Sequence, residues 1–341
     1  MVVGRTAEAE FLRSAKLLEA QISTASEETV VNLTTINKAF SLAAVLSLST
    51  FASANGSLLV EPRDLVEETN NGAIVIDLRE NESERELSIL PGSIASPFSE
   101  WRGPADNPGL VLSELRANQL FGDLGINPSD RIILATAGGS NSAFGAAARA
   151  VWDLKSFGFN NVGILHGGFA AYEAANLPPA ESYLRLKPEV LSLSFDDTFY
   201  APKGDLLDVI KSGVSTQLLD ARPPAWHNGN KWHPASHTPG TLKGSKVLDY
   251  SRFFVSQESS RLKTEAQIRS TLEASDVEPD NISFCEAGWW SAGNWFIVSQ
   301  LAGYENSKLY AEGRVEWSRS ELPQVNVPSP KELEKLKKAL N

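Results

Sequence analysis

The feature that most constrains the fold is an internal duplication of the chain. Asp77 and Asp220 each close a short apolar segment and stand 143 residues apart, while Gly168 and Gly313 stand 145 residues apart. Landmarks that lie far apart along the chain therefore share nearly one offset. A repeat of this length exceeds the unit of a solenoid, so it indicates two similar domains.

Each copy alternates strand-like and helix-like segments, a pattern typical of an α/β fold with a mostly parallel central sheet flanked by helices. The expected strands are short β-branched runs, and the expected helices carry apolar residues on one face. The segments recur in the same order: strands at 74–79 and 131–135 with a helix at 143–157, then strands at 217–222 and 281–285 with a helix at 294–301.

We expect the two domains at residues 58–180, the first half, and at residues 204–325, the second half. The segment 181–203 between them contains prolines and no clear periodicity, which is typical of a linker. Residues 326–341 combine a Pro-Ser-Pro turn with Lys, Glu and Leu, which predicts a solvated tail helix. A chain of 341 residues is long enough for two domains of moderate size.

Residues 1–54 form an N-terminal extension that ends in a signal-like segment. Asn37-Lys38 precedes 13 mostly apolar residues, and Ala52-Ser53-Ala54 has the small residues of a cleavage site. A signal at about 36–54, cleaved after Ala54, predicts a periplasmic or secreted protein. An ordinary buried helix is the alternative. The lead before Ile36 is long for a signal, and one explanation is that translation starts near that residue.

Composition excludes several classes of partner. The net charge of −11 disfavours nucleic acid, because binding there requires Lys and Arg to neutralise phosphates. The sequence has no apolar run of about 20 residues, so a membrane span is not expected. A single cysteine can form no internal disulfide, and no Cys/His cluster predicts a structural metal site. We expect a monomer that uses neither a metal nor an organic cofactor.

The single cysteine, Cys285, stands where an apolar strand ends and a helix is about to begin. Backbone N–H groups and the helix dipole create positive potential at such a position, and they stabilise a thiolate. Sites in open α/β sheets also lie at the carboxyl ends of strands. Cys285 is therefore the candidate nucleophile. The alternative is an inert buried thiol, since free cysteines are often buried.

Two chemistries use a cysteine in such a loop. A phosphatase needs an arginine six residues after the cysteine to hold phosphate oxygens, and Ser291 stands there instead. Sulfur transfer needs a thiolate that attacks the outer sulfur of a donor, together with N–H groups that stabilise the resulting persulfide anion. The loop therefore favours sulfur transfer over phosphate hydrolysis.

The chain resembles the tandem-domain rhodaneses, the thiosulfate/3-mercaptopyruvate sulfurtransferase family, over about residues 58–325. It is also similar to an exported subgroup that carries a signal peptide. Each motif is weak alone, but their order in two copies is specific. The resemblance rests on the cysteine loop and on Ile76–Arg79, Leu219–Arg222, His237–Gly240, Ala146–Trp152, Phe157–Phe159, Leu165–Gly168 and Tyr310–Ser318.

This resemblance implies an enzyme that moves sulfane sulfur from a donor such as thiosulfate or 3-mercaptopyruvate to cyanide or a thiol. Cys285 would carry the persulfide, in a catalytic second half, while the first half would be inactive. Alignment of strands places Ala135 opposite Cys285, whereas alignment of the following helices places Ser140 there. Neither residue supplies a thiol.

The loop that follows the cysteine is predicted to bind the anionic substrate. Its residues are Glu286, Ala287, Gly288, Trp289, Trp290 and Ser291. The resemblance adds Arg222 on the substrate side, although a salt bridge of Arg222 with Asp220 or with a loop carboxylate is the alternative. Asp220 is expected to order its loop. His237 is a supporting candidate, with His227 and His233 as further cations or surface residues.

The loop departs from both familiar forms of the family. Thiosulfate users often carry basic residues after the cysteine, and mercaptopyruvate users tend to have a Gly-Ser/Thr-Gly-Val-Thr run. Glu286 stands here instead, and an inward-pointing carboxylate weakens the attraction of anionic donors. Trp289 and Trp290 could wall a pocket for a larger donor or pack between domains. A slow or non-enzymatic sulfur carrier is therefore the alternative function.

Overall fold

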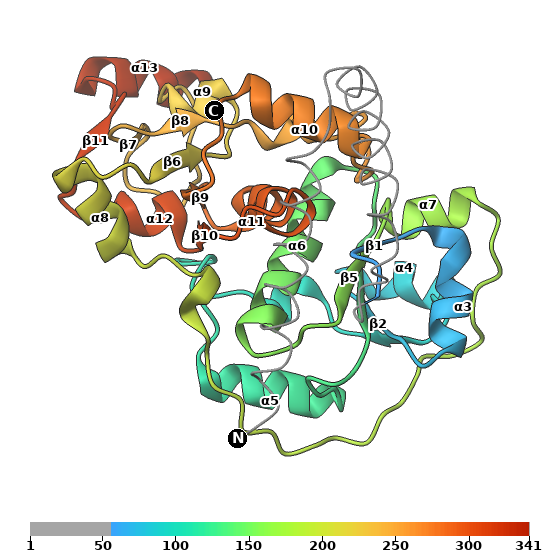
Figure 1. The fold of residues 1–341 in the computed structure, drawn as a ribbon. Helices are drawn as coiled ribbons and strands as arrows, with labels where there is room; N and C mark the ends of the chain where they lie inside the picture. Colours follow the sequence, from blue (N-terminus) through green and yellow to red (C-terminus); the bar gives the residue numbers. More distant parts are fainter. Residues whose placement is uncertain (1–55, 341) are drawn as a thin grey trace, which may run out of the picture. The chain divides into compact units, whose positions relative to one another are not determined.

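The structure, a computed structural model, describes residues 56–340. The extension 1–54 and its expected signal segment lie outside the described residues. None of the helices within residues 56–340 is long and apolar enough to cross a membrane. The expected α/β class with mostly parallel sheets is confirmed, as described below (Figure 1).

The first half is built on a five-stranded parallel sheet in the order β1-β5-β4-β2-β3. Its central strands are buried on both faces, because helices cover both sides, and they consequently read as continuous apolar runs. The strands are β1 (Leu59–Val60), β2 (Ile74–Asp77), β3 (Ser93–Ala95), β4 (Ile132–Ala135) and β5 (Val162–Leu165).

Side chains at the N-caps mark where helices of the first half begin. Ser113 and Ser140 cap two of them by accepting hydrogen bonds from backbone N–H groups of the first turn. The helices are η2 (Pro62–Asp64), α3 (Leu65–Asn70), α4 (Glu82–Leu87), η3 (Phe98–Trp101), α5 (Glu114–Leu124), α6 (Asn141–Ser156) and α7 (Gly168–Ala174).

The second half repeats this plan with a four-stranded parallel sheet in the order β10-β9-β6-β8. This order matches β5-β4-β2-β3 of the first half, as the duplicated sequence predicts. The strands are β6 (Gln217–Asp220), β8 (Lys246–Val247), β9 (Asn281–Phe284) and β10 (Ser307–Tyr310), with a separate antiparallel pair formed by β7 (Thr241–Leu242) and β11 (Gln324–Val325).

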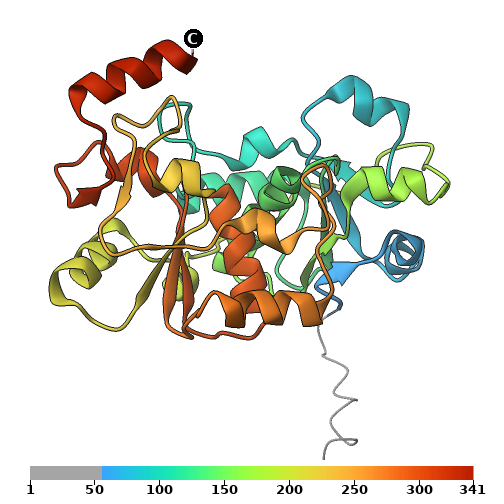
Figure 2. The same ribbon diagram turned by 90° about the horizontal axis from the view of Figure 1, so that it is seen from above.

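One helix of the second half extends further toward the N-terminus than predicted. The expected helix at 294–301 is the end of a longer run in which α11 passes directly into a π-helical stretch, η6. The other helices surround the sheet, and α13 stands out from the second half in Figure 2. They are η4 (Asp197–Phe199), α8 (Lys203–Ser212), α9 (Pro224–His227), η5 (Tyr250–Phe253), α10 (Glu265–Ala274), α11 (Trp289–Trp295), η6 (Phe296–Leu301), α12 (Gly313–Trp317) and α13 (Pro330–Leu340).

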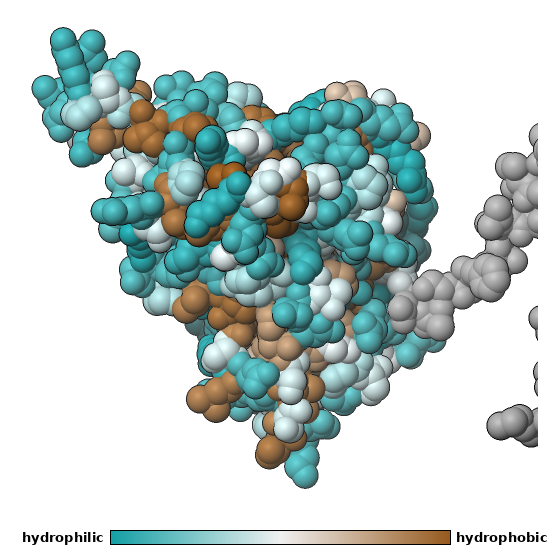
Figure 3. All heavy atoms as spheres, turned by 60° about the vertical axis from the view of Figure 1, so that its left-hand side comes forward, coloured by the Kyte–Doolittle hydropathy of each residue, from teal (hydrophilic) through white to brown (hydrophobic). Residues whose placement is uncertain are grey.

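The surface of the described residues is mainly hydrophilic on the face that Figure 3 shows, where apolar residues gather in separate patches. Residues 55–341 cluster as one compact unit rather than two. The domain boundaries expected from the sequence therefore stay a prediction.

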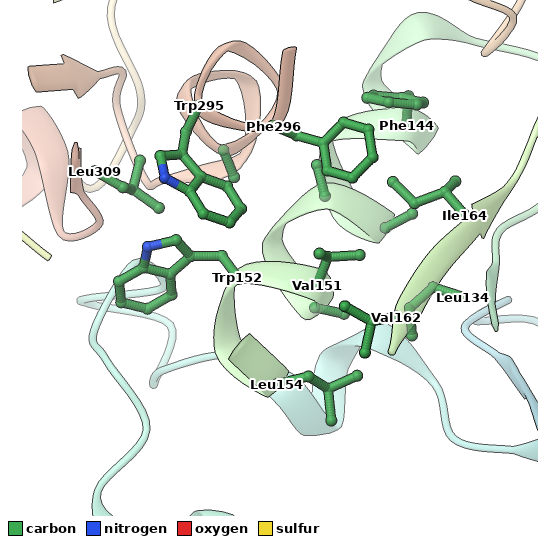
Figure 4. Packing of buried hydrophobic residues seen from close by; sticks show 14 of the residues in the cluster. Leu134, Phe144, Val151, Trp152, Leu154, Val162, Ile164, Trp295, Phe296 and Leu309 are labelled. Atoms are coloured by element: carbon green, nitrogen blue, oxygen red, sulfur yellow. The ribbon is translucent and has the colours of Figure 1, made fainter. Parts of the chain in front are cut away.

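Helix α6 of the first half packs against helix α11 of the second half, and a hydrophobic core surrounds this contact (Figure 4). Phe144 on α6 meets Phe296 edge to face, with ring centroids 5.6 Å apart. Trp152 and Trp295 are both fully buried in the same cluster, together with Leu309 of β10. The two halves therefore share one core, and α11 is held from both sides.

Each half also contains a buried ion pair at the carboxyl end of the equivalent strand. Arg79 Nη2 lies 2.6 Å from Asp77 Oδ2 after β2, and Arg222 Nη2 lies 2.6 Å from Asp220 Oδ2 after β6. Both pairs are almost completely shielded from solvent. Since the pair recurs in a half without a thiol, it is first of all a structural feature.

We predict that Asp77→Asn lowers the free energy of unfolding by about 3–5 kcal/mol, because it leaves the buried guanidinium of Arg79 without its counter-ion. Asp220→Asn should cost less, because Arg222 keeps its pair with Glu286. Asp276→Asn is the control. It breaks the exposed pair with Lys246 and should cost less than about 1 kcal/mol. Urea titration measures all three. A loss below about 1 kcal/mol for both buried variants contradicts the interpretation.

Urea titrations repeated at decreasing pH report on the protonation of Asp220. Burial alone would raise the pKa of this carboxyl group, but the attraction of Arg222 and three side-chain hydrogen-bonding partners hold it well below its usual range. The unfolded chain therefore binds this proton more tightly than the folded chain does. The stabilisation is complete above the ordinary pKa of 3.8 and is lost as the pH falls through the lower folded value. The stability difference between wild type and Asp220→Asn should shrink accordingly below that pH.

Candidate active site

Cys285 follows directly after β9, and three residues separate it from the start of α11. Gly288 closes this turn with a φ of +82°, a conformation that favours glycine. A Cβ at this position would lie 2.3 Å from the carbonyl oxygen of Ala311 and 2.7 Å from Nη1 of Arg149. The tight loop around Cys285 therefore requires glycine for both conformation and space.

Two donors point at the sulfur atom of Cys285. The backbone N–H of Gly288 lies 3.2 Å from Sγ, and the hydroxyl of Ser291 lies 3.3 Å from it. The side chain is almost buried, with 3% of the residue exposed. Donors held by a turn and a helix cannot reorganise freely, so they favour negative charge on the sulfur atom.

The sulfur faces a small pocket of about 150 Å³. Indole rings form much of its wall, and the lining residues come from both halves of the chain. They are Ser142, Trp226, His233, Cys285, Glu286, Ala287, Trp289 and Trp290. Most of the loop predicted to bind the substrate thus lines one cavity. Gly288 and Ser291 do not line the pocket but donate hydrogen bonds to the sulfur atom.

Glu286 points inward, yet its charge is compensated. One carboxylate oxygen pairs with Nη1 of Arg222, and the other accepts a hydrogen bond from Ser236 Oγ at 2.6 Å. Glu286 itself is 6% exposed. The electrostatic penalty expected from this residue is therefore reduced but not removed, since Arg222 also pairs with a second carboxylate.

Arg222 has no free face toward a donor. Its Nε and Nη2 donate to Asp220, its Nη1 donates to Glu286, and Nη2 also reaches the carbonyl oxygen of Gly240 at 2.9 Å. The arginine is fully buried. This placement favours the alternative that the sequence left open, in which Arg222 forms salt bridges with Asp220 and a loop carboxylate.

Asp220 is the centre of this buried network. It accepts the backbone N–H of Arg222 at 3.1 Å and the hydroxyl of Thr241 at 2.8 Å. Nδ1 of His227 lies 3.1 Å from its Oδ2. The carboxylate thus connects the end of β6 to β7 and α9.

The three candidate histidines lie in different surroundings. His237 is exposed, does not line the pocket, and gives only its backbone N–H to Ser318. His227 pairs with Asp220. His233 lines the pocket, and its Nδ1 accepts the N–H of Ala235 at 3.1 Å, which assigns the ring proton to Nε2.

The charge of His233 is disfavoured by its position. Burial lowers the pKa of this imidazole, and Arg102 adds to the effect, while Glu286 partly opposes it. The ring is therefore mainly neutral at pH 7, so it offers an N–H donor to the pocket rather than a positive charge.

A chain of hydrogen bonds ties the loop to the first half. Trp290 Nε1 donates to Ser142 Oγ at 3.1 Å, Ser142 Oγ lies 3.1 Å from Tyr250 Oη, and Tyr250 donates to Asn141. Burial raises the pKa of Tyr250 to about 12, so its proton stays in place near neutrality. Because that proton goes to Asn141, the hydroxyl of Ser142 is the donor to Tyr250.

The two tryptophans fulfil both roles that the sequence left open. Trp290 stacks on Tyr250 with ring centroids 4.9 Å apart, and Trp289 meets Phe98 edge to face at 5.5 Å. Arg102 lies over the ring of Trp289 at 4.2 Å. The indoles therefore wall the pocket and at the same time hold the two halves together.

The strand register revises the comparison with the first half. Asp77 pairs with Ala135, and Asp220 pairs with Phe284, so Ala135 is equivalent to Phe284. The residue opposite Cys285 is accordingly Thr136 rather than Ala135 or Ser140. The difference arises because the expected strand at 281–285 ends one residue earlier, at Phe284. The first half still has no thiol at this place.

Sequence reasoning named none of the first-half residues that reach the pocket or its wall. Ser142 lies in the first turn of α6 and lines the pocket, and Arg102 follows η3 and lies over the ring of Trp289, which also lines the pocket. Neither residue belongs to a recognisable motif. Trp226 of α9 was not singled out either. Within residues 56–340, no group of His, Cys, Asp and Glu side chains is arranged to hold a metal ion.

The chain is similar to known proteins over both halves. The family model "Rhodanese-like domain" matches residues 61–175. A "Putative thiosulfate sulfurtransferase" from Synechococcus elongatus is 25% identical over 289 residues, which cover 82% of this chain and 88% of that protein.

Solved structures share the fold at lower identity. SseA from Escherichia coli, reported for the "Rhodanese" fold and mechanism of 3-mercaptopyruvate sulfotransferases, has a TM-score of 0.59 and 21% identity. It covers 76% of this chain and 98% of its own. The anaerobic ergothioneine biosynthesis enzyme from Chlorobium limicola, in complex with trimethyl histidine, has a TM-score of 0.69 and 16% identity, over 78% and 69% of the respective chains. Residues 61–175 therefore match the rhodanese-like domain model, and the chain as a whole is similar to sulfurtransferases of this fold.

Proposed function

We propose that this protein is a sulfurtransferase that moves sulfane sulfur from a small donor to a thiophilic acceptor through a persulfide on Cys285. The observation that carries the proposal is the position of Cys285, which lines a pocket while its Sγ accepts hydrogen bonds from Gly288 and Ser291. The relatives named as thiosulfate and 3-mercaptopyruvate enzymes support the choice of donor class.

Loading begins when the thiolate of Cys285 attacks the outer sulfur atom of the donor. With thiosulfate, a bond forms between Sγ and that sulfur, the sulfur–sulfur bond of the donor breaks, and sulfite leaves with the electron pair. With 3-mercaptopyruvate, the carbon–sulfur bond breaks instead, and the methylene carbon takes the thiol proton to give pyruvate. Both routes leave an anionic persulfide on Cys285.

Discharge regenerates the thiolate. Cyanide or a thiolate attacks the terminal sulfur, the bond between the two sulfur atoms breaks, and the electron pair returns to Sγ. Thiocyanate or a new persulfide leaves. The loop amides from Glu286 to Ser291 would hold the terminal sulfur anion in both steps, so the transfer needs no metal or organic cofactor.

A second candidate function is a sulfur carrier with slow turnover. It is favoured by the pairing of Glu286 with Arg222, which removes the positive side chain that would otherwise attract an anionic donor to the second half. A carrier would still load the persulfide but would discharge it poorly to small acceptors.

Incubation with thiosulfate or 3-mercaptopyruvate should add about 32 Da to the protein, one sulfur atom on Cys285, as measured by intact mass and peptide mapping. Cys285→Ser should abolish the addition without loss of stability. Cyanide should then remove the added mass. Retention of the mass in cyanide and thiols favours the carrier, and the absence of any adduct with every sulfane donor contradicts the proposal.

Glu286→Gln should strengthen the binding of anionic donors. The variant keeps hydrogen bonds to Arg222 and Ser236 but removes the excess negative charge of the cluster formed by Asp220, Arg222 and Glu286. We expect the KM for thiosulfate to fall by about tenfold, which corresponds to roughly 1.4 kcal/mol of recovered attraction.

The matched control for this change is Glu273→Gln, which removes an exposed carboxylate from α10 outside the pocket. It should leave KM unchanged. An equal KM for wild type and Glu286→Gln means that the carboxylate does not oppose the donor.

We also propose that the protein is exported and works as a monomer. The signal-like segment before Asn55 is the basis for export. N-terminal sequencing of the native protein should give a chain that starts at Asn55. A chain that retains residues 36–54 contradicts cleavage after Ala54.

A further inference from the structure

The pocket around Cys285 has little positive charge from its own half. Arg222 is fully buried between two carboxylates. Arg314 is equally buried and donates to Gln324 and to the carbonyl oxygen of Thr238; its Nε has no hydrogen-bond partner among residues 56–340, but the residue does not line the pocket. His233 is kept mainly neutral by burial. None of these three side chains presents a positive charge on the pocket wall.

Arg102 of the first half is a different kind of arginine. It follows η3, and its guanidinium carbon lies 4.2 Å from the ring centroid of Trp289, a residue that lines the pocket. Its Nε is buried and has no hydrogen-bond partner within the part of the chain that the structure describes. A buried donor without a partner is rare in proteins and requires an explanation.

The surroundings of Arg102 leave its charge largely available. Glu80 is the acidic group that acts on it, but both carboxylate oxygens of Glu80 accept hydrogen bonds from Ser99 at 2.8 Å. Burial lowers the pKa of Arg102, although the group stays protonated at neutral pH. Its field also reaches the imidazole of His233 on the pocket wall.

We propose that Arg102 is a specificity-determining residue, which binds the anionic group of the sulfur donor at the pocket while Cys285 attacks the sulfur atom. The ligand class is a small donor that carries a carboxylate or a sulfonate. This inference rests on the proposed function and deepens it.

The geometry of an arginine suits this task. A guanidinium presents its N–H groups as a planar fork that matches two oxygen atoms of a carboxylate or sulfonate. The ring of Trp289 fixes the plane of the fork through a cation–π contact, so less freedom is lost when the anion binds. The first half, which has no thiol at the equivalent place, thereby takes part in donor selection.

Alkylation of Cys285 tests the inference without any sulfur donor. Iodoacetate and iodoacetamide have nearly the same size, but only iodoacetate is an anion. Arg102→Gln should lower the ratio of the iodoacetate rate to the iodoacetamide rate by about tenfold, the effect of losing one charge-assisted hydrogen bond. The ratio for Arg102→Lys should lie between those of Arg102→Gln and wild type, because lysine keeps the positive charge but lacks the planar pair of N–H donors.

The matched control is Arg116→Gln, which removes an exposed arginine from α5 of the same half. It should leave the ratio unchanged. A general change in access to the thiol alters both rates and cancels in the ratio. An unchanged ratio in Arg102→Gln overturns the inference and leaves the contact with Trp289 as packing alone.

Donor kinetics separate this inference from the proposed function. Arg102→Gln should raise the KM for thiosulfate and for 3-mercaptopyruvate by about 10- to 100-fold with little change in kcat. If wild type forms no adduct with any donor, the proposed function fails, while the alkylation ratio still decides the role of Arg102. If wild type forms the adduct and Arg102→Gln has an unchanged KM, only the role of Arg102 fails.

Discussion

The close packing of helix α6 against helix α11 is the contact on which the site depends. A Cβ on Gly145 would lie 2.9 Å from the carbonyl oxygen of Trp289, so the first turn of α11 rests directly on the backbone of α6. The cysteine loop ends at that turn. The first half therefore fixes the position and orientation of the loop through a shared hydrophobic core. The hydrogen-bond donors of the loop consequently stay directed at the sulfur atom.

The charges beneath the loop follow from the same duplication. An Asp-x-Arg pair closes the equivalent strand in each half, and it is a structural ion pair in both. In the second half, Glu286 extends this pair toward the pocket. The cost of burying a carboxylate is thus offset by Arg222, but the cluster no longer offers a free cation to a substrate. In the first half, Arg102 lies over Trp289, and the role proposed for it would supply positive charge beside the pocket.

The sequence predicted the duplicated α/β fold and the place of Cys285 because both depend on local signals. Continuous apolar strands, glycine turns and a lone cysteine are visible in a single stretch of chain. The pocket depends instead on tertiary contacts between segments far apart in sequence. Ser142, Trp226 and Arg102 carry no motif, so the approach of the first two to the pocket and of Arg102 to Trp289 could not be predicted. The saturated pairing of Arg222 was one of two open alternatives, since spacing alone does not reveal which carboxylates surround a buried guanidinium.

A crystal structure of the protein after exposure to thiosulfate tests the central claim most directly. The account predicts one additional sulfur atom bonded to Sγ of Cys285, with its terminal end surrounded by the backbone N–H groups of residues 286–291. It also predicts that Trp290 keeps its hydrogen bond to Ser142, because the loop is already ordered before loading. The account is contradicted if the protein gains the mass of one sulfur atom in solution, but the crystal structure shows Cys285 as an unmodified thiol and the sulfur bound elsewhere.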